Sequence, residues 1–445
     1  MTSLRSGVKL SLMKKFILFI FFILLTNVNA SDSTKSLSNS PQSIDNERFK
    51  EIDLSKVKSY KTFNIPYKAN PNLETLQWYF FRDLFIRFPR KDNTYSVEPS
   101  QNPYEFKFDV IEDKFVKKQL QTKGILSYLY FEDDKIIIDE LSPKDRLGKF
   151  LNNETKFSSN SMGKSLVSYV LGNAICEGYI DSVDSRINDW DLVKNTFYEN
   201  HKLIDLLNMA SGDQKYVYDD HFLEEGKLNR LFENWVGLYT TKALMSVNFQ
   251  NIKPIKKKYN YNVVNTSLIL NYVLFKTGDN FQKLLDKTFK EKAKTKEIVY
   301  FYRMPRKKSL DGNAWPILFS TRLDYLRIAK AMLDDYQNDT CVGKYLKEIY
   351  DRRIKKNINQ DGDFSEPHFN RTYTYGGQFH MDYYGLKNKI VFGMGGYGGQ
   401  AILIDVENSR IVVVNSIHYN NTGYKFNHKK LLINPIKHGK KSFKR

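Results

Sequence analysis

The longest regular hydrophobic pattern in the chain lies between residues 161 and 178. Its apolar positions recur at spacings of three and four residues, at Leu166, Val167, Val170, Leu171, Ala174 and Ile175. This spacing predicts a helix with a buried face, and Gly178 suits its C-terminal end. Shorter patterns of the same kind predict helices over residues 203–209, 263–277 and 323–333.

Strand patterns lie on both sides of these helices. Residues 125–131 and 136–138 are rich in Ile, Leu, Tyr and Phe, and the polar residues 132–135 separate them, which predicts a hairpin. The last third of the chain contains four more β-rich segments, at 371–379, 390–392, 401–406 and 411–417. The final two fit a hairpin around residues 407–409.

The order of these elements predicts the fold class. Strands come early and late in the chain, and helices fill the middle. This order favours an α+β fold (a mixed α/β protein) in which helices flank an antiparallel sheet and an all-helical subdomain is inserted. The sequence shows no repeat with a period of 20 to 50 residues, which argues against a repeat array.

The N-terminus has the pattern of a secretory signal. Four basic residues precede an unbroken apolar run over residues 16–25, and the small-residue sequence Val28-Asn29-Ala30 follows it. The run is shorter than the ~20 residues of a bilayer span. We therefore expect a signal peptide over residues 1–30, a flexible lead-in over 31–60, a main domain over 61–445, and a periplasmic or secreted protein that is soluble once the signal is removed.

The charge of the chain is strongly positive, with 69 Lys and Arg against 50 Asp and Glu and a formal net charge of +19. Part of it lies in the signal, and eight basic residues lie between 425 and 445. The remaining lysines are spread along the chain, as on a solvated surface. We expect no nucleic-acid partner; loose attraction to anionic envelope surfaces is the alternative use of this charge.

The composition excludes several classes of protein. Hydrophobic residues make up 41% of the chain and charged residues 27%, unlike a disordered chain, a collagen or a multi-span membrane protein. Two cysteines, Cys176 and Cys341, are too few for a disulfide framework, and a single bridge between them stays open. The seven histidines lie in no zinc-binding spacing, and no G-x-G-x-x-G sequence leads from a strand into a helix, so we expect no metal and no organic cofactor.

The strongest chemical signal is an S-x-x-K sequence at the front of the longest predicted helix. Residues three apart on a helix share a face, so the amine of Lys164 can reach the hydroxyl of Ser161. A serine is a weak nucleophile until a neighbouring base takes its proton, and a desolvated lysine can be that base. The alternative is a capping serine beside a solvent-exposed lysine.

The wider sequence resembles the serine β-lactamase-related proteins, in the branch with class C β-lactamases, esterases and 6-aminohexanoate-oligomer hydrolases. The similarity lies in the Ser161–Lys164 motif with its helix, in the segment 180–187, and in Leu206-Leu207-Asn208-Met209-Ala210-Ser211-Gly212, which is similar to that family's "LLTMxSG". It covers residues 120–430. It implies the α+β fold and catalysis through an acyl-enzyme.

The resemblance also implies further site residues. Tyr261 heads the helix that closes at Thr277-Gly278, as the family's proton-transferring tyrosine does, with Tyr259 as a nearby competitor. The glycine run 393–399 aligns with the family's K/H-T/S-G element. Its Lys/His and Thr/Ser positions fall on Gly393 and Met394, so the polar part is absent.

The glycine run and one neighbouring loop supply the remaining candidates. Backbone N–H groups of Ser161 and Gly396 are the expected oxyanion hole. Tyr397, within the glycine run, is a candidate substrate contact. Tyr218 is the other, because it follows Ser211-Gly212 where relatives carry a tyrosine, with Tyr216 in competition for the role.

These expectations describe an exported serine hydrolase acting on an amide or ester in a small-molecule or peptide-like substrate. Ser161 is the nucleophile, Lys164 the base and Tyr261 the proton shuttle. One alternative is a β-lactamase or D,D-peptidase. The other is a non-catalytic envelope binding protein on the same fold.

Overall fold

The computed structural model describes residues 94–213, 245, 256–303, 314–356, 372–417 and 424–443. The expected signal peptide, the lead-in and the first part of the expected main domain lie outside these residues. So do Tyr216 and Tyr218.

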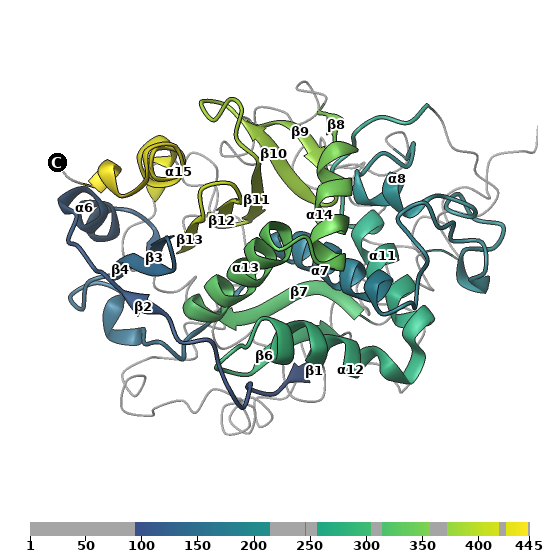
Figure 1. Ribbon diagram of the computed structural model, residues 1–445, viewed down its shortest axis with the longest axis horizontal. Coiled ribbons are helices and arrows are strands. Elements are labelled where there is room, and N and C mark those ends of the chain that lie inside the picture. Colours follow the sequence, from purple (N-terminus) through teal and green to yellow (C-terminus); the bar gives the residue numbers. More distant parts are fainter. Residues whose placement is uncertain are drawn as a thin grey trace, which may run out of the picture.

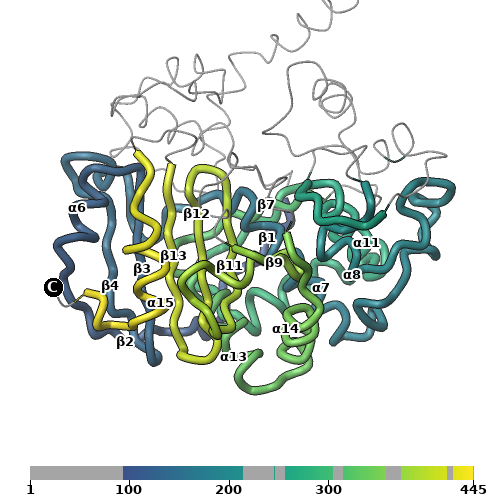
Figure 2. Tube along the Cα trace, turned by 90° about the horizontal axis from the view of Figure 1, so that it is seen from above, coloured from purple at the N-terminus to yellow at the C-terminus, as the bar shows by residue number. Residues whose placement is uncertain are grey.

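Within the described residues, the larger of two sheets has nine strands in the order β2-β4-β3-β13-β12-β11-β10-β9-β8. Neighbouring strands are antiparallel except for β2 and β4, which are parallel. Their bounds are β2 Lys107–Phe108, β3 Ile125–Glu132, β4 Lys135–Leu141, β8 Ile354–Lys355, β9 Thr372–Gly376, β10 Phe379–Tyr383, β11 Val391–Gly396, β12 Gln400–Asp405 and β13 Arg410–Ser416. Figure 2 shows β3, β13, β12 and β11 side by side.

A second sheet has four strands in the order β1-β6-β7-β5. Its strands are β1 Thr94–Val97, β5 Lys156–Ser158, β6 Val299–Arg303 and β7 Ala314–Thr321. Strand β5 pairs with β7 and leads directly into the helix that begins at Met162. This small sheet therefore sets where that helix starts.

Helices cover both faces of the nine-stranded sheet (Figure 1). Helices α6 and α15 pack on one face, and α7 and α13 pack on the other. The α-helices of the described ranges are α6 Lys114–Thr122, α7 Met162–Cys176, α8 Leu203–Leu207, α11 Val264–Thr277, α12 Phe281–Leu285, α13 Arg322–Gln337, α14 Cys341–Asp351 and α15 Asn434–His438. Within the described ranges, no helix is both long enough and apolar enough to cross a bilayer.

The apolar sequence of β3 explains why this sheet is buried on both faces. Leu129 and Phe131 point into the large core beneath α7 and α13, and Tyr128 and Tyr130 point into a smaller core beneath α6 and α15. Alternate side chains of a strand point to opposite faces, so a strand with large apolar side chains on both faces needs a cover on each side.

The structure confirms most of the elements predicted from the sequence. The hairpin 125–138, the four predicted helices and the hairpin around 407–409 are all present. The segment 371–379 is different: it contains β9, a turn at Gly377-Gln378 and the first residue of β10. The four-stranded sheet and the helices α6, α12, α14 and α15 have no counterpart among the predicted elements.

Helices α7 and α14 are joined by a disulfide bond between Cys176 and Cys341. The question that the sequence left open is answered, because both cysteines of the chain are in this bridge. The bridge joins the last residue of α7 to the first residue of α14.

Candidate active site

A sharp turn delivers Ser161 to the start of α7. Asn160 has a φ of 45°, in the left-handed region that few residues other than glycine adopt. The preceding residue, Ser159, is fixed on β7: its N–H donates to the Leu318 carbonyl at 2.8 Å, and its Oγ accepts from the Leu318 N–H at 2.9 Å. The backbone on both sides of the turn is therefore held in place.

The start of α7 lies directly against β7. A Cβ added at Gly163 would lie 2.1 Å from the Pro316 carbonyl oxygen, so the site tolerates only glycine. Residues 162–174 of the helix are all buried. This burial gives the helix, and with it Ser161, a rigid support.

Lys164 lies beside Ser161, as the motif predicted. Its Nζ donates a hydrogen bond to Ser161 Oγ at 3.1 Å, and the residue is only 7% exposed. Ser161 stands at the N-cap position of α7, yet its side chain makes no capping hydrogen bond. The hydroxyl contacts the lysine instead of capping the helix, which disfavours the capping-serine interpretation.

Tyr261 is the tyrosine whose ring faces this lysine. Lys164 Nζ lies 4.7 Å from the centre of the Tyr261 ring, a cation–π distance. Tyr259, the other candidate for the proton-transferring tyrosine, is buried and packs on Tyr375, with ring centres 5.2 Å apart. The structure thus brings Ser161, Lys164 and Tyr261 together.

A buried carboxylate fixes the segment that carries Tyr261. Asp213 Oδ1 accepts from Asn260 Nδ2 at 2.8 Å, and its Oδ2 accepts from Asn262 Nδ2 at 3.1 Å and from the Tyr198 hydroxyl at 2.9 Å. Burial raises the pKa of Asp213 above its usual range. The residues before and after Tyr261 are therefore held by one side chain.

The same asparagine connects this segment to α11. Asn262 Oδ1 accepts from the Asn265 N–H at 3.0 Å, near the start of α11. This bond fixes the orientation of the Asn262 amide, so its NH2 group faces Asp213.

The glycine turn between β11 and β12 closes the site on another side. Asn160 Nδ2 donates to the Tyr397 carbonyl at 2.8 Å. A Cβ added at Gly396 would lie 2.4 Å from the Ser159 carbonyl oxygen. Gly396 is therefore in close contact with the turn that carries Ser161, while the Tyr397 ring packs on the large core.

Three residues that the sequence analysis did not single out complete the surroundings of Tyr261. The rings of Tyr375 and His380 each lie 6.0 Å from its ring, centre to centre. Lys356 Nζ lies 3.0 Å from His380 Nδ1. Tyr375 comes from β9, His380 from β10 and Lys356 from the residue after the edge strand β8, and no sequence motif marks them.

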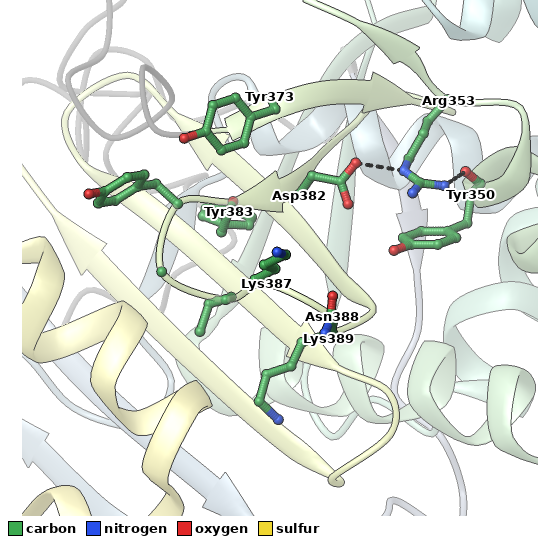
Figure 3. Close-up of a pocket in the computed structure, with 11 residues that line it drawn as sticks. Tyr350, Arg353, Tyr373, Asp382, Tyr383, Lys387, Asn388 and Lys389 are labelled. Carbon is green, nitrogen blue, oxygen red and sulfur yellow. Dashed lines mark hydrogen bonds and ion pairs between the residues drawn. The ribbon is translucent and has the colours of Figure 1, made fainter.

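Two hollows lined by described residues lie near this end of the large sheet. One, of about 540 Å³, is bordered by the turn between β10 and β11, and the ion pair between Arg353 and Asp382 forms one wall (Figure 3). The other, of about 480 Å³, is lined by Tyr259 and Lys356 and so borders the surroundings of Tyr261. Across the described ranges, no group of three or more His, Cys, Asp or Glu is arranged to hold a metal ion.

The architecture is that of the serine β-lactamase-like fold, as the motifs predicted. The structure is similar to that of a protein assigned as a 6-aminohexanoate-dimer hydrolase from Bacillus anthracis, with a TM-score of 0.57 and 14% identity over 78% of this chain and 91% of that chain.

Two further solved structures are similar over most of their length. Unliganded simvastatin synthase from Aspergillus terreus has a TM-score of 0.50 and 14% identity, over 70% of this chain and 92% of that chain. A hydrolase with promiscuous acyltransferase activity has a TM-score of 0.50 and 12% identity, over 71% of this chain and 94% of that chain.

Sequence comparison adds nothing to these likenesses. No family model matches the chain, and no curated protein matches it. At 12 to 14% identity, the structural likeness shows the fold alone.

Proposed function

We propose that this protein is an exported serine hydrolase that cleaves an amide or ester bond through an acyl-enzyme. The observation that carries the proposal is the 3.1 Å contact between Lys164 Nζ and Ser161 Oγ at the start of a buried helix. A hydroxyl becomes an effective nucleophile when a positioned base takes its proton. Lys164 occupies that position and is largely removed from water.

Acylation begins when the neutral Lys164 amine takes the Ser161 proton. The Ser161 oxygen forms a bond to the substrate carbonyl carbon, and the carbonyl oxygen becomes an oxyanion held by the N–H groups of Ser161 and Gly396. The carbonyl then re-forms as the bond to the leaving group breaks. Tyr261 delivers a proton to the departing amine or alcohol, drawn from the Lys164 ammonium.

Deacylation uses the same groups in reverse. A water molecule attacks the acyl carbonyl, and its proton passes to the base. The bond to Ser161 Oγ breaks and that oxygen recovers its proton, which regenerates the free enzyme. Splitting the reaction into two acyl transfers replaces one difficult step with two easier ones.

The strand beside the nucleophile favours simple esters and amides over β-lactams. A Cβ at Gly393 would lie 1.7 Å from the Tyr383 hydroxyl, so β11 has no room for the cationic side chain that the family's third motif carries there. A β-lactam carboxylate has no charged partner at this point. We therefore expect a higher kcat/KM for simple esters than for any penicillin or cephalosporin, and the reverse order would favour the β-lactamase alternative.

An acylating probe tests the nucleophile directly. A fluorophosphonate should label Ser161, and Ser161→Ala should abolish labelling and lower turnover by about 10³-fold or more. Ser158→Ala is the matched control, because Ser158 lies three residues earlier on β5. The mechanism would be contradicted if mass spectrometry located the fluorophosphonate label on another serine, or if Ser161→Ala kept full activity. Absence of both labelling and turnover in the wild-type protein would favour the binding-protein alternative.

Export is supported by the signal pattern and by the bridge between Cys176 and Cys341. Structural disulfides persist in oxidising compartments such as the periplasm and the extracellular medium. A reporter fused to residues 1–35 should cross the inner membrane, and the mature protein should begin near Ser31. Retention of the reporter in the cytoplasm would contradict this localisation.

A further inference from the structure

Two lysine-rich segments that are far apart in the sequence meet at one hollow. Lys257 and Lys258 precede the segment of Tyr261, and Lys355 and Lys356 come from the end of β8 and the residue after it. All four line the 480 Å³ hollow, which we call the lysine pocket. The other described residues of its lining are Asp205, Asn208, Ala210, Tyr259 and Ile354.

The charges of the lysine pocket are unequal. Among the lining residues that the structure describes, Asp205 is the one carboxylate, and it pairs with Lys257 at 2.5 Å. The described part of the lining therefore contains three more positive charges than negative ones. Like charges gathered around one cavity repel each other, and a bound anion would offset this repulsion.

The walls of the lysine pocket are held by the fold and not only by flexible side chains. Asn208 Nδ2 donates to the Arg352 carbonyl at 2.8 Å, and Asn208 Oδ1 accepts from the Gly377 N–H at 3.0 Å. These bonds connect the end of α8 to the segment before β8 and to the turn after β9. The cavity is thus built into the junction of three elements.

One lysine connects the pocket to the catalytic cluster. Lys356 is only 6% exposed; its Nζ lies 5.7 Å from the centre of the Tyr259 ring and 3.0 Å from His380 Nδ1. The His380 ring is in turn 6.0 Å from the ring of Tyr261. An anion in contact with Lys356 would lie close to the proposed proton shuttle.

We propose that the lysine pocket binds an anionic ligand through a carboxylate or phosphate group. Lysine ammonium groups are point charges with several donors each, and they suit both kinds of oxyanion. This inference goes beyond the proposed hydrolase activity and does not depend on it.

Calorimetry with two probes, inorganic phosphate and glutarate, tests the site in the full chain at low ionic strength. Wild-type protein should bind at least one of them, and Lys258→Ala/Lys355→Ala should weaken binding at least about fivefold, because two of the charges are gone. Both lysines are exposed, and neither belongs to the proposed catalytic groups.

The matched control removes the same charge elsewhere. Lys135 on β4 and Lys437 on α15 are exposed and far from β8 in the sheet order. Lys135→Ala/Lys437→Ala should bind the probes as the wild type does. Equal weakening in the two double variants, or no binding of either probe to the wild type, would overturn the proposal.

Thermal unfolding gives a second measurement that needs no turnover. Phosphate or glutarate should raise the Tm of the wild type and raise that of the pocket variant less, because a ligand stabilises the state that binds it. An equal rise in both proteins would contradict the site. Failure of the Ser161 labelling experiment would leave these binding results unaffected.

Competition between phosphate and ester substrates distinguishes two sources for the anion in the lysine pocket: a part of the substrate or a separate molecule. If the pocket receives an anionic part of the substrate of Ser161, phosphate should raise the KM of a carboxylate-bearing ester and leave the KM of a neutral ester unchanged. If it receives a separate anion, phosphate should leave both KM values unchanged. Either result is compatible with the site, and the calorimetric comparison decides whether the site exists.

Discussion

At the scale of single residues, the candidate site depends on the Ser161 hydroxyl, which does not cap helix α7. A serine at the start of a helix ordinarily caps it by accepting from a backbone N–H. Here no such bond forms, and the oxygen instead faces Lys164. The left-handed turn at Asn160 and the hydrogen bonds of Ser159 to β7 fix this arrangement.

Asp213 positions Tyr261 by accepting hydrogen bonds from the residues on either side of it, Asn260 and Asn262. An Asp213→Asn variant would place an NH2 group where a carboxylate oxygen now accepts from Asn260 or Asn262. We predict a fall in kcat with KM nearly unchanged, together with a loss of about 1–3 kcal/mol in the free energy of unfolding. Steady-state kinetics and urea unfolding measure both.

Tyr198→Phe is the control for this prediction. It removes one donor to Asp213 and leaves the bonds to Asn260 and Asn262 in place. We expect a comparable loss of stability and a much smaller loss of kcat. If both variants lowered kcat equally, Asp213 would have a purely structural role.

At the scale of elements, the bridge between α7 and α14 stabilises the helix that carries the nucleophile. Its cysteines are 165 residues apart. Cross-linking so long a loop restricts the unfolded chain, an effect of about 2–4 kcal/mol in typical cases. We predict this loss for Cys176→Ser/Cys341→Ser in urea unfolding, with kcat retained. The matched control is wild-type protein with reductant, which should lose a similar amount; no change in either would contradict the prediction.

The sequence predicted the parts of the site that lie within single segments. Ser161 and Lys164 share one helical turn, and Tyr261 directly precedes a helix with a clear pattern. The surroundings of Tyr261 depend instead on the turn at Gly377-Gln378, which the sequence analysis placed inside one strand.

Tertiary contacts, and not local propensity, set that turn. Gln378 has a φ of 69°, and its Nε2 donates to the carbonyls of Leu206 and Leu207. Its Oε1 accepts from Thr266 of α11, and its carbonyl accepts from Ser165 of α7. Partners so distant in the sequence leave no local pattern. Tyr375 and His380, on either side of the turn, were therefore missed.

At the scale of the whole molecule, one buried cation makes stability depend on pH. Lys156 on β5 is 9% exposed, and its Nζ makes no hydrogen bond; the nearest carboxylate oxygen with which it forms an ion pair is Glu297 Oε2, at 3.9 Å. Burial lowers the pKa of Lys156 to about 8, although Asp324, Glu297 and Glu154 act in the opposite direction. Burial also raises the pKa of Glu297.

The lowered pKa of Lys156 determines the direction in which stability changes with pH. Below pH 8 the lysine is charged in both states, and its burial destabilises the folded protein. Between about pH 8 and pH 10.5, the ordinary pKa of lysine, the unfolded chain binds more protons than the folded one, so the contribution of Lys156 to stability rises with pH.

We predict that Lys156→Met stabilises the protein by about 1–3 kcal/mol at pH 7. This advantage over the wild type should shrink as pH rises from 8 to 10. Urea unfolding at pH 7, 8.5 and 10 measures it, with the exposed Lys135→Met as control; a constant difference across this range would contradict the prediction.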